Sequence, residues 1–168
     1  MATEISLDLI KDLRERSGAG VMDCKRALEA SGGDIEKALQ FLTEQGIASA
    51  AKKASRVTAQ GLVESYIHAG RIGALIEVNC ETDFVARTEE FKALAHELAM
   101  QVLASNPLVV SEEELPEDAI EPAEQAVLML QPYIRDPSKN IRQLINETIG
   151  KTGENIQVKR FARFELGQ

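Results

Sequence analysis

The spacing of hydrophobic residues changes along this chain from a helical period to an alternating one. Before residue 48, apolar residues recur every three or four positions, as they do along one face of an α-helix. From Ile72 to Val78 every second residue is apolar, which indicates a strand with one buried face. A chain that contains both periods in separate regions is expected to fold into a mixed structure of helices and strands.

The residues before this change predict three short amphipathic helices. The first starts near Ile5, the second starts near Val21, and Asp34 is expected to cap a third helix that ends near Gly46. Turns that contain glycine separate the helices. We therefore expect a compact three-helix bundle, close to the lower size limit for independent folding.

Residues 48–56 are rich in alanine and lysine and have no clear apolar stripe. They indicate a helical or flexible linker between two differently patterned regions. We accordingly divide the chain into an N-terminal three-helix module of residues 1–47, this linker, and an α+β core domain of residues 57–168.

The core domain begins with a predicted pair of strands. Residues 57–67 form the first, and the alternating segment that starts at Ile72 forms the second. Gly61 indicates a bulge or a close contact in the first strand. A third strand is expected at residues 156–165.

Three helical segments are expected between the second strand and the third. The clearest follows Thr88 and ends at Asn106, and another is expected to begin at Asp136, with Pro137 as its first residue. The segment between them has four candidate core residues, which are Ile120, Val127, Leu130 and Ile134. This order predicts an α+β fold in which helices pack on one face of a three-stranded antiparallel sheet.

Composition argues against several classes of function. The formal net charge is −8 and acidic side chains concentrate between Ser111 and Glu124, so we expect no direct binding of nucleic acid. Two cysteines and two histidines fit neither a disulfide framework nor a metal site. The sequence has no signal-peptide pattern and no run of ~18 apolar residues, so we expect a cytoplasmic protein without membrane contact.

Sequence motifs of catalysis are also missing. The chain has no GxSxG elbow, no phosphate-binding GxxxxGK[ST] loop and no HExxH pair. The glycines at 18, 20, 32 and 33 join predicted helices and are expected to form turns. We therefore expect no enzyme activity, no cofactor and no bound metal.

The segment from Glu77 to Arg87 joins the clearest strand to the clearest helix, and its residues permit two interpretations. In the first, Thr82 starts a helix and Phe84 folds inward as a hydrophobic staple. In the second, the turn presents Asp83 and Phe84 outward, where an acid beside an aromatic anchor binds a partner.

Two motifs resemble those of the elongation factor Ts family. The first runs from Leu13 to Leu28, with the sequence LRERSGAGVMDCKRAL, and the second is the segment Glu77–Arg87, with TDFV at its centre. They occur in the order found in the family, and the resemblance extends from about Ile5 to the end of the chain. Ser17 stands where the family usually has threonine, which keeps the hydroxyl group.

The resemblance implies a guanine nucleotide exchange factor for elongation factor Tu, with a ubiquitin-associated-like N-terminal module and a core domain that embraces the GTPase. Phe84 would act as a wedge and Asp83 would disturb the Mg²⁺ site of the partner, so that GDP is released. The residues expected beside that nucleotide site are Thr82, Asp83, Phe84 and Val85. The residues expected to dock the N-terminal module are Leu13, Arg14, Gly18, Gly20, Val21, Met22 and Lys25.

The chain is short for a member of this family. Long members carry a second core subdomain and a coiled-coil excursion, and no sustained heptads or second strand pair predict either of them here. Short members resemble this chain and tend to act as dimers, so we expect a homodimer. Two other functions stay open: an adaptor that recognises ubiquitin-like or nascent-chain partners, and a small hydrolase that uses Asp83 and Glu81.

Overall fold

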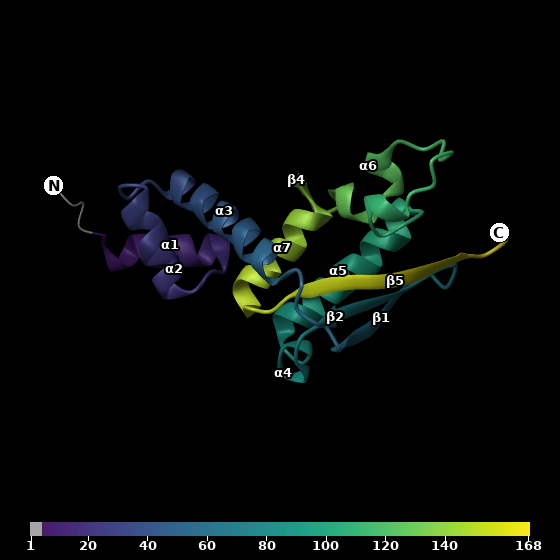
Figure 1. Cartoon of the computed structure of the whole chain (residues 1–168), viewed down its shortest axis with the longest axis horizontal. Helices are drawn as coiled ribbons and strands as arrows, with labels where there is room; N and C mark the ends of the chain where they lie inside the picture. Colours follow the sequence, from purple (N-terminus) through teal and green to yellow (C-terminus); the bar gives the residue numbers. More distant parts are fainter. Residues whose placement is uncertain (1–4) are drawn as a thin grey trace.

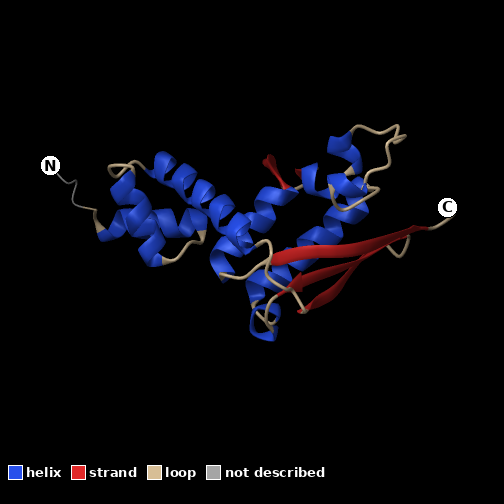
Figure 2. Ribbon diagram, in the orientation of Figure 1, coloured by secondary structure: helices blue, strands red, loops and turns tan. Residues whose placement is uncertain are grey.

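The computed structural model describes residues 5–168 and shows an elongated molecule (Figure 1). Three helices form its N-terminal end, and a sheet with helices on one side forms the other end (Figure 2). The N-terminal helices are α1 (Leu7–Ser17), α2 (Val21–Ala30) and α3 (Ile35–Lys53). The α+β class expected from the sequence is confirmed.

The core domain contains a three-stranded sheet and a small two-stranded one. The strands are β1 (Gln60–His68), β2 (Ile72–Cys80), β3 (Pro132–Tyr133), β4 (Asp136–Asn140) and β5 (Ile156–Glu165). The helices are α4 (Asp83–Ala86), α5 (Glu89–Ser105), α6 (Ala123–Ala126) and α7 (Ile141–Thr152), with 3-10 turns at Glu112–Glu114 and Leu128–Leu130. Strand β2 is central and pairs antiparallel with β1 and β5.

Side-chain caps start the first and third N-terminal helices, α1 and α3. Ser6 Oγ accepts a hydrogen bond from the backbone N–H of Leu9 at 3.2 Å, and Asp34 Oδ1 accepts one from Lys37 at 3.0 Å. Gly18 ends α1 with a φ of 65°, a conformation that favours glycine. The helices share a core of their own, made of Ile10, Leu13, Cys24, Ala27, Leu28 and Ala38.

Helix α3 does not end near Gly46, so that prediction is wrong. The helix continues to Lys53, because its second half packs against α7 and places Ala50 in the core of the α+β domain. Gly46 lies where the two helices cross, not at a helix end. Residues 48–53 are therefore helical, one of the two forms that the sequence left open, whereas the division into domains stays a prediction.

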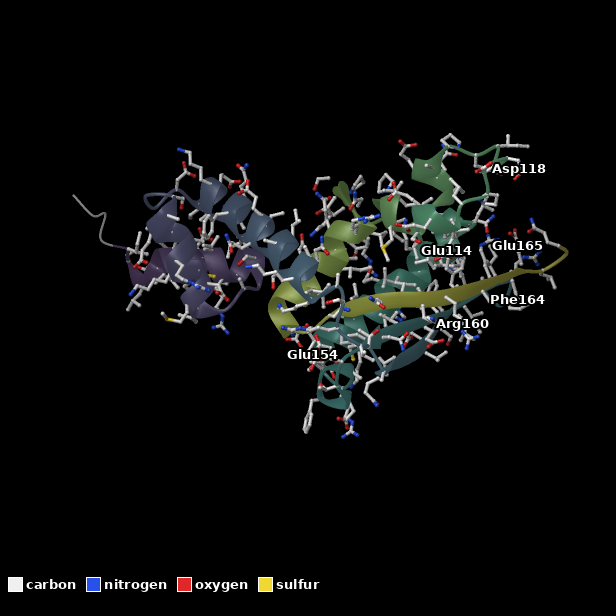
Figure 3. All side chains as sticks on the ribbon, in the orientation of Figure 1. Glu114, Asp118, Glu154, Arg160, Phe164 and Glu165 are labelled. Carbon is white, nitrogen blue, oxygen red and sulfur yellow. The ribbon has the colours of Figure 1, made fainter. Side chains whose placement is uncertain are left out.

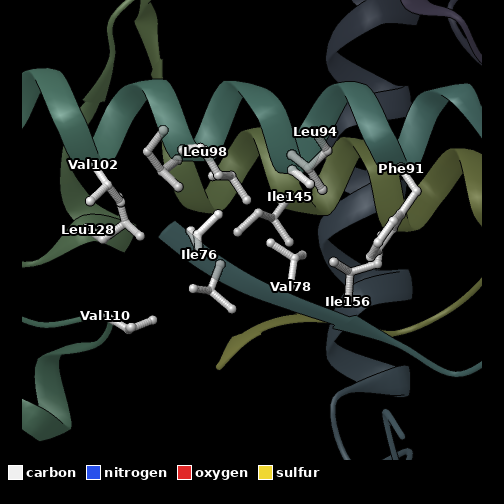
Figure 4. Packing of buried hydrophobic residues seen from close by; sticks show 14 of the residues in the cluster. Ile76, Val78, Phe91, Leu94, Leu98, Val102, Val110, Leu128, Ile145 and Ile156 are labelled. Carbon is white, nitrogen blue, oxygen red and sulfur yellow. The ribbon is translucent and has the colours of Figure 1, made fainter. Parts of the chain in front are cut away.

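Helices α5 and α7 cover one face of the three-stranded sheet and form the main core with it (Figure 4). Helix α5 contributes Phe91, Leu94, Leu98 and Val102, and the central strand contributes Ile76 and Val78. The apolar residues at helical spacing in this segment are all buried, and they are Phe91, Leu94, Ala95, Leu98 and Val102. The alternation of apolar residues in β2 and their helical spacing in α5 thus identify the two elements at the centre of the core.

Gly61 in β1 passes very close to β2. A Cβ atom at this position would overlap the carbonyl oxygen of Val78 and lie 2.8 Å from the Cα of Asn79. The φ of Gly61 is also 150°, which L side chains rarely adopt. Of the two roles that the sequence indicated for this glycine, the structure shows the close contact.

The helix predicted around residues 120–134 is wrong in extent. The only helical elements there are α6 and a 3-10 turn, followed by β3, and Ile120 is 94% exposed. Pro122 and Pro132 bracket the segment and restrict a continuous helix. The chain instead leaves α6 at Val127 to bridge to Val109, with Leu128 N–H donating to the Val109 carbonyl at 2.9 Å. Val127 is buried as expected, while Ile134 is exposed.

The helix predicted to have Asp136 as its N-cap starts four residues later. Residues 136–140 form β4, and Asn140 caps α7 in a capping box with Gln143. Asp136 Oδ1 accepts a hydrogen bond from Ser138 N–H at 3.2 Å, so this aspartate caps a local turn in place of a helix.

Candidate functional site

A single turn of helix, α4, carries the residues of the TDFV motif at the end of β2. Thr82 is its N-cap, and Thr82 Oγ1 accepts a hydrogen bond from the backbone N–H of Val85 at 3.4 Å. Thr88 then caps α5 in the same way, with Oγ1 accepting from Phe91 N–H at 3.3 Å. Two closely spaced caps therefore fix the path of the chain from strand to helix.

Phe84 points away from the protein, with 79% of the residue exposed to solvent. The interpretation of Phe84 as an inward staple is therefore wrong, and Phe91 fills the core position by itself. Asp83 is half-exposed beside it and forms an ion pair with Arg87 at 2.8 Å. An acid and an aromatic ring are thus accessible next to each other at the tip of the core domain.

Thr82 and Val85 have a different position from their two neighbours. Val85 is buried in the main hydrophobic core, and the Thr82 hydroxyl donates a hydrogen bond to Glu154 Oε1 at 2.6 Å. The structure therefore divides the predicted site. Asp83 and Phe84 are available to a partner, Thr82 is also exposed but caps the turn, and Val85 is buried beneath it.

Residues far away in the sequence support this turn. Glu154 accepts hydrogen bonds from Glu81 and Thr82, and Glu81 Oε1 in turn accepts one from Asn155 N–H at 2.7 Å. The Asn155 N–H holds the pKa of the Glu81 carboxyl below its ordinary value, and Arg56 adds to this effect. Sequence reasoning misses Glu154, because a charged residue in a short loop has no periodicity to follow.

Cys80 lies directly beneath the turn and is fully buried. Its Sγ donates to the carbonyl oxygen of Thr82 at 3.2 Å. Burial of the thiol, together with the negative charge of Glu154, raises the pKa of Cys80 to about 11. Cys80 is therefore a protonated, structural residue at neutral pH.

The N-terminal segment expected to bind a partner is also divided between surface and core. Leu13 is fully buried in the three-helix core. Val21 and Met22 are 50% and 64% exposed at the start of α2, an unusual position for two adjacent apolar side chains. The remaining expected residues are exposed as well, and they are Arg14, Gly18, Gly20 and Lys25.

The fold brings the two segments together. A cavity of about 380 Å³ is lined by Arg14, Gly18 and Gly20 of the N-terminal motif. On its other side lie Val85 of the TDFV motif and Thr88, the N-cap of α5. Lys151 at the end of α7 also lines the cavity, and its side chain lies 2.9 Å from the position that a Cβ atom at Gly18 would occupy. Residues of both motifs therefore line one cavity at the junction of the N-terminal helices and the core.

Residues 5–168 contain no group of three or more His, Cys, Asp or Glu side chains arranged to hold a metal ion. Within the same residues, no helix is both long and apolar enough to cross a membrane. Cys24 and Cys80 are both buried and free.

Comparison with known proteins gives one consistent family. A family model described as Elongation factor TS matches residues 35–126. Elongation factor Ts of Thermotoga neapolitana is 50% identical over 98% of this chain and 98% of its own. The protein of the same name from Desulforamulus reducens is 46% identical over 98% of this chain and 90% of its own, and that of Caldanaerobacter subterraneus is 47% identical over 98% of both.

Proposed function

The chain belongs to the elongation factor Ts family, and we propose that it is a guanine nucleotide exchange factor for elongation factor Tu. The family name itself places the protein in translation elongation. The observation that best supports exchange is the exposed Phe84 on a turn held by hydrogen bonds from several segments. Exposed aromatic anchors of this kind contribute strongly to protein interfaces.

Nucleotide exchange requires coupling between two ligands of the GTPase. If the factor binds the nucleotide-free GTPase more tightly than the GDP-bound form, GDP must weaken binding of the factor by the same ratio. Burial of Phe84 in the partner would contribute about 1.5–3 kcal/mol. This energy corresponds to about one to two powers of ten in affinity, so the wider interface must supply the rest.

Asp83 is the residue we assign to the Mg²⁺ site of the partner. In the free protein its carboxylate is paired with Arg87, and both side chains are substantially exposed. An exposed ion pair of this type contributes little stability, so Asp83 can leave Arg87 at small cost when a partner arrives. Arg87 then remains free to contact an acidic group of that partner.

The N-terminal module provides the second contact in this proposal. Val21 and Met22 supply exposed apolar area, and Arg14 and Lys25 supply positive charge around it. Leu13 contributes indirectly, because it is buried and holds α1 in the module.

The proposed function needs no covalent step, so the protein would not be an enzyme. A hydrolase that uses Asp83 and Glu81 finds no support in the geometry, because Arg87 binds Asp83 while Arg56 and Asn155 bind Glu81. An adaptor that works only through the three helices would leave the exposed Phe84 without a function.

We also propose that two copies of the chain associate through the uncovered face of the sheet, in the cytoplasm. The helices lie on the other face (Figure 2). Ile67, Gly73 and Phe164 form one row across the three strands, and Phe164 is 74% exposed. Leu75 extends this apolar surface along β2, and Val63 is exposed farther along β1, in the row that holds the ion pair of Glu77 and Arg160. A second copy would cover the exposed apolar side chains of this face.

Substitution of Phe84 tests the exchange function. We expect Phe84→Ala to slow factor-stimulated release of fluorescent GDP from elongation factor Tu by about ten- to a hundredfold, with little change in Tm. Ile120→Ala is the matched control, since Ile120 is an equally exposed apolar residue in another region. Parental rates with Phe84→Ala would contradict the role of Phe84. A parental protein that does not accelerate GDP release would contradict the function itself.

A further inference from the structure

Helix α4 is too short to hold Phe84 in one direction without support. It has four residues, and isolated helices of this length are not stable in water. Phe84 itself is almost free of contacts with the protein, so its own packing cannot fix the turn. Within the motif only the buried Val85 and the cap at Thr82 anchor the turn, so groups outside the motif that bind this cap help to determine where the ring points.

Glu154 makes the most concentrated set of contacts with this turn. Its Oε2 accepts hydrogen bonds from the backbone N–H groups of Glu81 and Thr82, at 3.1 and 3.0 Å. Its Oε1 accepts the Thr82 hydroxyl proton at 2.6 Å. Glu154 lies between the end of α7 and the start of β5 (Figure 3). One carboxylate thus joins the end of β2 to a segment more than 70 residues later.

The hydrogen bond between Glu154 and the Thr82 hydroxyl fixes how this hydroxyl is oriented as the N-cap of α4. A threonine hydroxyl has one proton and two lone pairs. Because Thr82 donates its proton to Glu154, its lone pairs remain for the Val85 N–H, which donates to the same oxygen at 3.4 Å. Glu154 therefore orients the group that starts α4.

Glu154 is itself held by a reciprocal contact. Glu81 Oε1 accepts a hydrogen bond from the backbone N–H of Asn155, the residue that follows Glu154. The Asn155 side chain donates to the carbonyl oxygens of Ala54 and Arg56 at 3.3 and 2.9 Å. The segment that carries Glu154 is thereby tied both to β2 and to the end of α3.

We propose that Glu154 is a positioning residue, which holds the Thr82 turn so that Phe84 is presented to the partner in one direction. The inference rests on the proposed exchange function and extends it to a residue outside the two motifs. The ladder from Cys80 to Ile156 pairs β2 with β5 without Glu154. Its loss should therefore loosen the turn and leave the sheet intact.

The first measurement uses the free protein and needs no partner. Glu154→Gln keeps the size of the side chain but removes the charge and one acceptor. We expect amide hydrogen exchange at Glu81, Thr82 and Val85 to accelerate by about tenfold or more, the factor that corresponds to one hydrogen bond with a charged group. Glu97→Gln is the matched control, because Glu97 also binds two donors, Tyr133 and Arg135, on another part of the fold.

The second measurement asks whether Glu154 acts through Phe84. We expect Glu154→Gln to slow maximal GDP release by about tenfold in the parental protein and by less than about twofold in a Phe84→Ala background, because coupled residues are not additive. Glu97→Gln should leave both rates at their starting values. Thr82→Val, which removes only the hydroxyl, should show the same dependence on Phe84.

The outcomes separate this inference from the function on which it rests. Unchanged amide exchange at the turn in Glu154→Gln would overturn the inference even if exchange activity falls. Equal losses in the parental and Phe84→Ala backgrounds would also overturn it, since they indicate a general structural effect. If the parental protein does not accelerate GDP release from elongation factor Tu, the proposed function fails. Accelerated amide exchange in Glu154→Gln would still establish Glu154 as the residue that holds the turn.

Discussion

Gly46 of α3 and Gly150 of α7 face each other where the two helices cross. A Cβ atom at Gly150 would lie 3.9 Å from the Gly46 Cα, and one at Gly46 would lie 3.6 Å from the carbonyl oxygen of Asn146. Both distances are ordinary van der Waals contacts, so the crossing has room for one methyl group and for little more. This contact joins the N-terminal helices to the core domain.

The crossing predicts opposite effects for two substitutions at one position. Gly150→Ala should stabilise the protein by up to about 1 kcal/mol, because alanine is the better helix former and its methyl group fits. Gly150→Leu should force the helices apart and destabilise by about 1–3 kcal/mol. Urea unfolding of the two variants checks this, and equal destabilisation by both would contradict the spacing described.

Gly61 should not accept any side chain. Gly61→Ala would bring Cβ into the backbone of β2 at Val78, and the φ of 150° is strained for alanine. We expect a loss of at least about 1–3 kcal/mol, seen as a decrease in Tm of about 2–12 °C for a chain of this size. Gly32→Ala is a useful comparison, since Gly32 also has a positive φ but no atom within 4 Å of the place that an added methyl group would occupy. A similar loss at both sites would show that backbone strain alone is responsible.

Cys80 predicts a decrease in stability at alkaline pH. Its pKa is about 11 in the folded protein against an ordinary value of 9.0, so the folded state binds the proton more tightly. The contribution is complete below pH 9, where both states are protonated, and is lost as the pH rises from about 9 to about 11. Urea unfolding of the parent and of Cys80→Ala across this range should show the steeper decline in the parent. Parallel curves would contradict the raised pKa.

The uncovered sheet face predicts self-association. We expect light scattering of the parental protein at micromolar concentration to give twice the 18.4 kDa mass of the chain. Phe164→Glu should shift the protein to the monomer, because a carboxylate would be buried without a partner. Val57→Glu, at an exposed position outside the sheet, should not. A parental protein that is monomeric throughout, with no GTPase present, would contradict the proposal.

Regular elements of this fold could be predicted from sequence because their own residues determine them. The alternation in β2 and the single apolar face of α5 coincide with the buried residues of the core. The end of α3 could not be predicted in this way, since its last two turns are stabilised by α7 and carry no apolar stripe. The segment after Pro122 has apolar residues at helical spacing, but its buried Val127 is held by backbone bonds to Val109, which sequence periodicity does not reveal.

The candidate site shows the same limit. The TDFV motif could be located from its sequence, but the direction of Phe84 also depends on contacts made by residues outside the motif. The most important of these come from Glu154, in a loop whose sequence has no regular pattern. A hydrogen bond between segments this far apart in the chain becomes visible only when the strands β2 and β5 are paired.

Because α3 is one continuous helix, the number of residues in it determines the angle at which the N-terminal module is oriented relative to the core domain. Each residue turns an α-helix by about 100° and advances it by about 1.5 Å. Deletion of one residue between Gly46 and Ala50 would therefore rotate Val21 and Met22 by about 100° around the axis of α3 relative to Phe84. A flexible linker of the same length would absorb such a change. In this protein, the number of residues in one helix determines whether both surfaces can face the same partner.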